Sequence, residues 1–121
     1  MTTLPDRNRL LAAIAGLVGA AGVCIAAAAS HSGDANLTIV SNFLLFHAPV
    51  LLILSFLKAN RIATLAAYVL ILGLLLFCGD LAMRSLAGHS LFPMAAPIGG
   101  GTLILAWLLV AGSAFTGRPT A

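Results

Sequence analysis

Charged residues divide this chain into four long uncharged stretches, and that spacing limits its possible folds more than any other feature. The stretches hold 24 uncharged residues (Arg9 to Asp34), 23 (Asp34 to Lys58), 18 (Arg61 to Asp80) and 33 (Arg84 to Arg118). A helix needs about 20 residues, at about 1.5 Å each, to cross a hydrocarbon core about 30 Å thick. The first three stretches each fit one crossing, and the fourth fits one crossing preceded by a polar segment. The apolar runs are continuous rather than alternating, which argues against a membrane β-barrel.

The pattern predicts an all-α membrane protein, a single domain over residues 1–121 built as a bundle of four transmembrane helices. The helices are expected at about 9–29, 38–57, 62–83 and 95–115. Composition supports this prediction, because 61% of the residues are apolar and only 7% are charged, against about 25% charged in soluble domains. So few charges exclude a soluble enzyme and a disordered chain. The net charge of +3 is too thinly spread for a nucleic-acid-binding surface.

The distribution of Lys and Arg predicts how the helices are oriented, since cytoplasmic loops carry the excess of positive charge. One side of the four-helix arrangement holds Arg7, Arg9, Lys58, Arg61 and Arg118, whereas the other holds Arg84. We therefore expect both termini in the cytoplasm of a bacterial cell, with residues 30–37 and 84–94 outside its inner membrane. The first apolar run is about 20 residues long, beyond the 7–15 of a signal-peptide core, so we expect it to remain uncleaved.

Small residues recur at helical spacing and predict where helices approach one another closely. In lipid the hydrophobic effect does not drive helices together, because lipid tails are as apolar as the helix surface. Small residues favour association there because they let two helix backbones pack closely. The predicted packing positions are Gly16, Ala20, Gly22 and Ala26 in the first helix and Gly99 and Gly100 in the last. Pro49 is expected to kink the second helix, because it frees the carbonyl of Leu45.

The residues able to carry chemistry gather in the outer half of the predicted arrangement. They are His31, His47, Cys24, Cys78 and Asp80, and side chains of these types bind zinc, copper or iron, while two histidines can hold a haem. None of the spacings matches a known metal motif. The competing interpretations are structural: His47 bonds a backbone carbonyl such as that of Leu45, the cysteines act as small apolar residues, and Asp80 pairs with Arg84 one turn away.

Three segments resemble the domain-of-unknown-function family 423, a family of small membrane proteins. They are Ala26–His31, which closes on a histidine, Phe43–His47, which also ends in one, and Phe77–Leu81 followed by Ala96–Gly100 and Ala106–Trp107. Together they extend over nearly the whole chain. The resemblance implies a protein with four membrane spans and supplies no established activity. The sequence departs from the family pattern at Cys78 and Asp80, where the family has serines.

Three functional hypotheses follow from the sequence. The first is a structural or accessory protein of the lipid bilayer that packs with itself as a homo-oligomer or with the subunits of a larger membrane complex. The second is binding of a metal, haem or small lipophilic ligand at the outer-half residues, above all His31 and His47. The third is a small oligomeric transporter or channel. We expect no enzyme, because no nucleophile and base are paired by their spacing, and the sequence requires no cofactor.

Overall fold

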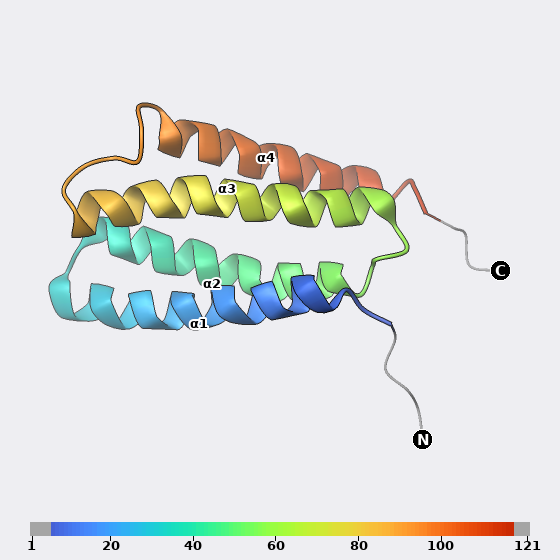
Figure 1. Cartoon of the computed structure of the whole chain (residues 1–121), viewed down its shortest axis with the longest axis horizontal. Helices are drawn as coiled ribbons and strands as arrows, with labels where there is room; N and C mark the ends of the chain where they lie inside the picture. Colours follow the sequence, from blue (N-terminus) through green and yellow to red (C-terminus); the bar gives the residue numbers. More distant parts are fainter. Residues whose placement is uncertain (1–5, 118–121) are drawn as a thin grey trace, which may run out of the picture.

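The computed structural model describes residues 6–117, which form four long helices and no strands (Figure 1). They are α1 (Arg9–Ser32), α2 (Ala35–Ser55), α3 (Arg61–Leu86) and α4 (Ala95–Ser113). Each is long and apolar enough to cross a membrane. The predicted all-α class and the four spans are therefore confirmed. The observed bounds differ from the predicted ones by up to three residues at each end.

The turn between α1 and α2 is shorter than predicted because both helices are capped there. Gly33 has a φ of 70°, which glycine adopts without strain, and its N–H donates to the carbonyl of Ala29. Asp34 directly follows and accepts hydrogen bonds from the backbone N–H groups of Asn36 and Leu37. Such caps satisfy the free N–H groups of a first helical turn. Two residues thus suffice to reverse the chain.

Asparagines cap the helices at the opposite end of the molecule. The side chain of Asn8 accepts from the N–H of Leu11 at the start of α1, and that of Asn60 accepts from Ile62 and Ala63 at the start of α3. By contrast, α4 begins after Met94, which has a φ of 69° and no side-chain cap.

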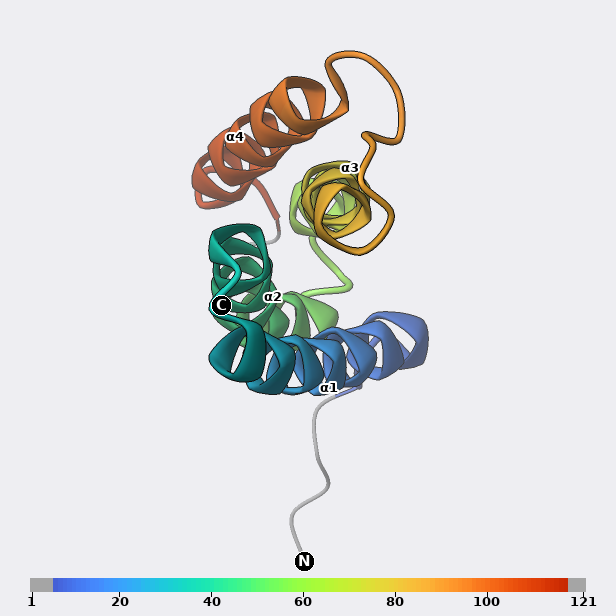
Figure 2. The same cartoon turned by 90° about the vertical axis from the view of Figure 1, so that its left-hand side faces the viewer.

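The helices form two hairpins, α1–α2 and α3–α4, joined through contacts between α2 and α3. Figure 2 shows α1 and α4 at opposite ends of the arrangement, with α2 and α3 between them. The bundle is therefore open rather than a closed square of four helices. The buried core consists mainly of leucines and alanines, among them Leu11, Leu51, Ala63, Ala67, Leu70 and Ala106.

The beginning of α1, the turn between α2 and α3, and the end of α4 all lie at one end of the molecule (Figure 1). The turns that connect α1 to α2 and α3 to α4 lie at the other end. This is the arrangement required of four successive membrane crossings. We call the end with the α2–α3 turn the inner end and the other the outer end.

Candidate functional site

His47 is the buried histidine of α2, and its ring joins α2 to α4. Its Nδ1 lies 2.8 Å from the carbonyl oxygen of Phe43, and its Nε2 lies 3.2 Å from Nε1 of Trp107. A carbonyl only accepts and an indole N–H only donates, so Nδ1 carries the proton and Nε2 accepts. The imidazole is thus neutral, with both ring nitrogens in hydrogen bonds.

The backbone partner of His47 differs from the one suggested by Pro49. The sequence favoured the carbonyl of Leu45, whereas the structure has that of Phe43. The reason is geometric: a helical side chain leans toward the preceding turn, where the residue four positions earlier lies on the same face. Leu45 is two positions earlier and lies on another side of the helix.

Aromatic rings surround His47 and form the largest cluster of such side chains within residues 6–117. The imidazole centroid lies 5.8 Å from the rings of Phe43 and Trp107 and 5.5 Å from that of Phe46. Phe77 of α3 packs on Phe43 with centroids 4.6 Å apart. A shallow apolar hollow of about 270 Å³ lies on the surface here, lined by Asn42, Phe43, Phe46 and His47. The cluster brings together side chains of α2, α3 and α4.

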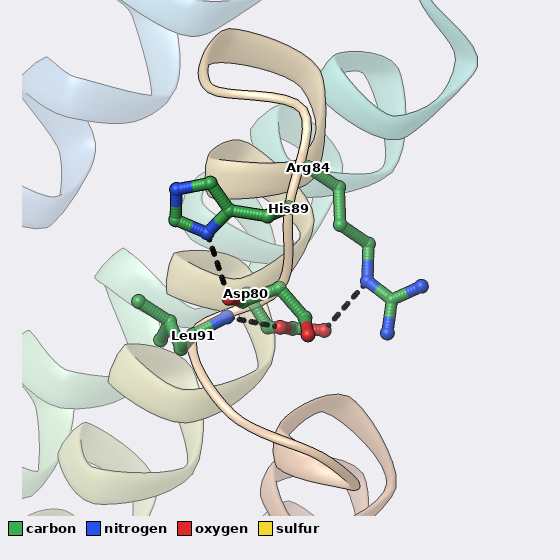
Figure 3. A network of polar contacts seen from close by, with 5 residues as sticks. Asp80, Arg84, His89 and Leu91 are labelled. Atoms are coloured by element: carbon green, nitrogen blue, oxygen red, sulfur yellow. Dashed lines mark hydrogen bonds and ion pairs between the residues drawn. The ribbon is translucent and has the colours of Figure 1, made fainter.

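Asp80 lies at the outer end, where it faces Arg84 and Leu91 (Figure 3), and its side chain is fully buried. Its Oδ2 accepts from Nε of Arg84 at 3.0 Å, as the spacing of four residues predicted. Its Oδ1 accepts from the backbone N–H of Leu91 at 2.9 Å. The carboxylate therefore fastens the loop between α3 and α4 onto α3. His89 in that loop is exposed, and its Nδ1 lies 3.0 Å from the carbonyl oxygen of Ser90.

Asp34 makes a second connection at the outer end. Besides capping α2, its Oδ1 accepts from the hydroxyl of Ser85 on α3 at 2.9 Å. These bonds favour the charged carboxylate, and the N–H of Leu37 contributes most, so the pKa of Asp34 lies below its ordinary value. The α1–α2 turn is thereby attached to the end of α3.

At the inner end, Asn60 connects α3 to the end of α4. Its Nδ2 donates to the carbonyl of Ser113 at 3.0 Å, while its Oδ1 caps α3. Lys58 forms an exposed ion pair with Asp6, and the hydrogen bond from Lys58 lowers the pKa of Asp6. Polar side chains therefore join separate helices at the outer end, at mid-depth and at the inner end.

The structure does not gather the candidate ligands into one site. His31 lies in the exposed last turn of α1, Cys24 is exposed on the same helix, and Cys78 is buried on α3. In the part of the chain that the structure describes, no three His, Cys, Asp or Glu side chains lie close enough to hold a metal ion. Binding of a metal or haem by these residues stays a prediction.

The predicted packing positions fall into two groups. Those at helix contacts include Gly22, where an added Cβ would lie 2.8 Å from Cγ of Leu45, and Gly99, where it would overlap the backbone of Phe77. Ala26 is half-buried, and a Cβ added at Gly100 would lie 3.8 Å from Cδ1 of Phe77. Gly16 has open space at its Cβ position, and Ala20 is exposed.

Among the contacts that the sequence did not predict are those of Gly73, Trp107 and Leu91. Gly73 contacts Leu103 on α4 as closely as Gly22 contacts Leu45. The bond of Trp107 to His47 and that of Leu91 to Asp80 were also missed. The contact of Gly73 could have been predicted, because a lone glycine within an apolar run indicates close packing. The two hydrogen bonds could not, because they join residues 60 and 11 positions apart in the sequence.

Comparison with known proteins gives one result. A family model described as "Protein of unknown function (DUF423)" matches residues 18–100, which is more than half of the chain. Most of the segments that carry the resemblance lie within this range, whereas Ala106–Trp107 follows it. No curated protein and no protein of solved structure matches the chain.

Proposed function

Because the chain belongs to the DUF423 family of unknown function, we propose its role from its own geometry: a non-catalytic, multi-pass component of a bacterial inner membrane. It acts by packing with itself or with the subunits of a larger membrane complex. The four apolar helices make it a small membrane protein, and the proposal concerns what that protein does in the bilayer.

The observation that carries the proposal is how the buried polar side chains are used. Within residues 6–117, every buried side-chain nitrogen and oxygen has a hydrogen-bond partner in the chain itself. His47 and Asp80 are the two groups best suited to chemistry, and both are engaged in holding helices or loops together. The hydrogen bonds of both groups lead to another helix or to a loop of the same chain, so each already has a part in holding the fold together. These side chains therefore support a structural role.

The surface of α1 favours association with another helix. Gly16 and Ala20 lie one turn apart on this helix and are exposed, and an added Cβ at Gly16 would meet no atom within 4 Å. Exposed small residues permit the close backbone approach on which helix association in lipid depends. The open arrangement of Figure 2 leaves α1 packed mainly on α2, with the rest of its surface free for a partner.

The second hypothesis, a bound ligand at the outer-half residues, makes a different physical demand. A metal or haem on His47 requires Nε2 to release Trp107 and turn toward the ligand. A transporter that couples to protons is expected to hold an ionisable side chain deep within a span, whereas Asp80 lies at the outer end and bonds Arg84 and Leu91. A ligand on His47 and a transporter that uses Asp80 would therefore each cost existing hydrogen bonds, and packing does not.

Native mass spectrometry of the protein, extracted gently from its own membranes, tests the proposal. We expect assemblies of several copies, or of this chain with other subunits, and no discrete additional small mass. A single chain with such a mass, lost in His31→Ala or His47→Ala but kept in the loop control His89→Ala, would contradict the proposal and support the ligand hypothesis. A single chain alone, free of any partner, would also contradict it.

A further inference from the structure

Asn42 is a polar side chain that the packing of α2 leaves without a partner. Its amide lies on the exposed surface and forms no hydrogen bond with any residue between 6 and 117. It is the eighth residue of α2, so it lies about 10 Å below the start of that helix. At that depth water is scarce, and leaving a polar group without a hydrogen-bond partner is unfavourable.

The other polar side chains in the spans have hydrogen-bond partners, so the unpartnered amide of Asn42 is unusual for this molecule. Hydroxyl groups satisfy themselves by donating to a carbonyl of their own helix, as seen at Thr38, Ser41, Ser55, Thr102 and Ser113. His47 and Trp107 bond each other. Among the described amide, hydroxyl, ring and carboxylate groups more than one turn inside a helix, only Asn42 forms no side-chain hydrogen bond.

The amide belongs to a continuous exposed stripe of α2 that we call the α2 face. Its members recur at intervals of three and four residues, as expected for one side of a helix: Asn42, Leu45, Phe46, Pro49, Leu52 and Ile53. Three of these residues, Leu45, Pro49 and Leu52, also line a groove of about 450 Å³ between α1 and α2, whose opposite wall includes Gly16 and Gly19. Apart from Asn42, the face is apolar.

We propose that two copies of this chain contact each other through the α2 face, with their Asn42 amides hydrogen-bonded to each other. The inference rests on the proposed function and names its partner as a second copy. Two copies inserted in the same orientation are related by a two-fold axis along the membrane normal. Residues of the same number on the axis then meet at the same depth.

The chemistry of the amide selects this partner. Asn carries both a donor and an acceptor, so two facing amides satisfy each other, whereas two like charges repel and two methyl groups gain no hydrogen bond. A ligand or a different protein would have to supply a matching polar group at the same depth. A second copy supplies it by symmetry. Side-chain hydrogen bonds of this kind contribute to helix association within membranes.

Resonance energy transfer between donor- and acceptor-labelled full-length chains tests the inference. The chains are placed in vesicles of phosphatidylethanolamine and phosphatidylglycerol, and the protein-to-lipid ratio is lowered stepwise. We expect Asn42→Leu to raise the dissociation constant about tenfold, while Asn42→Gln stays within about threefold of the wild type. The matched control is Asn36→Leu, which removes an amide near the end of the same helix and should leave association unchanged.

Cysteine cross-linking locates the contact independently of Asn42. In a chain with Cys24→Ala and Cys78→Ala, we expect Phe46→Cys on the α2 face to form a disulfide with its counterpart when copper phenanthroline is added. The control Leu72→Cys lies on α3, is also exposed, and is within about 3 Å of the same depth. It should remain uncross-linked.

Three results overturn the inference: a wild-type chain that stays monomeric at every dilution, an unchanged dissociation constant in Asn42→Leu, or cross-linking at Leu72→Cys in place of Phe46→Cys. Circular dichroism of each variant verifies that its helices are retained. A dimer through another face, or a complex with other subunits, removes the α2 contact but leaves the proposed function standing. If native mass spectrometry finds only single chains, both the α2 contact and the proposed function are contradicted.

Discussion

The hydrogen bond between His47 and Trp107 connects two helices that are otherwise only weakly in contact. The indole needs an acceptor because it lies within a membrane span, and the imidazole provides one because Phe43 holds its proton on Nδ1. Each ring thus fixes the role of the other. Replacing either ring leaves a polar atom of its neighbour without a partner.

A double-mutant cycle measures what this bond contributes. We expect His47→Leu and Trp107→Phe each to lower the free energy of unfolding. The expected interaction energy is about 0.6 to 1.7 kcal/mol, from the average to the largest value for hydrogen bonds inside membranes. Unfolding is followed by circular dichroism as dodecyl sulfate is added to mixed micelles. His47→Leu combined with Leu108→Ala, an exposed position, should be additive. Additivity in the His47–Trp107 pair itself would show that the bond contributes nothing.

The pH dependence of stability tests how much the Asp34 carboxylate stabilises the fold. This carboxylate accepts hydrogen bonds from the N–H groups of Leu37 and Asn36 and from the hydroxyl of Ser85. Since these bonds lower its pKa from 3.8, they stabilise the folded chain fully above that value. The contribution is lost as the pH falls through the lowered pKa. Thermal unfolding in micelles should therefore lose stability more steeply below pH 3.8 for the wild type than for Asp34→Asn. Parallel curves would contradict the assignment.

At the scale of helices, small residues determine how closely α3 and α4 pack. Gly99 lies directly against the backbone of Phe77, and Gly73 receives the side chain of Leu103. Both positions exclude a Cβ in the observed geometry. Because one contact lies on each helix, the pair interlocks, and sliding either helix along the other would bring a side chain onto a backbone.

Gly99→Ala and Gly101→Ala form a matched pair that tests this contact. Both add one methyl group and improve helix propensity on α4. At Gly99 the methyl meets the backbone of Phe77, whereas at Gly101 nothing lies within 4 Å. We expect Gly99→Ala to destabilise by about 1–3 kcal/mol, the cost of overpacking, and Gly101→Ala to be neutral or slightly stabilising. The same micelle titration measures both, and equal effects would argue against close packing at Gly99.

The sequence predicts the helices themselves well, for a physical reason. A membrane span needs a long apolar run, and charges such as Asp34 and Lys58 mark where each run ends. The exact bounds depend on caps, and these were not identified from the sequence. Gly33 and Asp34 close the first turn in two residues, so α1 continues to Ser32 and α2 begins at Ala35.

The candidate site was predictable only where its contacts are local. The pair of Asp80 and Arg84 follows from a spacing of one helical turn, which any helix brings together. The bonds to Trp107 and Leu91 depend on how helices and loops pack, and no spacing encodes that. Asn42 could be recognised as an amide within an apolar run, but its lack of a partner is evident only once the neighbouring side chains are placed.

At the scale of the whole molecule, the two hairpins place charges at opposite ends. Arg9, Lys58 and Arg61 lie at the inner end, while Arg84 lies at the outer end beside Asp80. The helices thus bring residues far apart in sequence into one layer of positive charge. We expect this layer to determine the orientation of the chain, because positively charged loops remain in the cytoplasm.

Orientation is tested by labelling single cysteines with a maleimide that does not cross membranes, in a chain with Cys24→Ala and Cys78→Ala. The structure offers two exposed loop positions, His89 at the outer end and Ala59 in the α2–α3 turn. We expect His89→Cys to react in intact cells and Ala59→Cys to react only after permeabilisation.

A fluorescent reporter fused after Ala121 should read cytoplasmic. The two cysteine positions are preferable to a reporter inserted near Asp34. That turn consists of the two capping residues, and an insertion would separate them. The opposite labelling pattern would reverse the orientation, and reaction of both cysteines in intact cells would show insertion in two orientations. In either case charge would not be what orients this chain. If the expected pattern holds, Lys58→Gln combined with Arg61→Gln should weaken it, because that pair supplies the positive charge of the loop between α2 and α3.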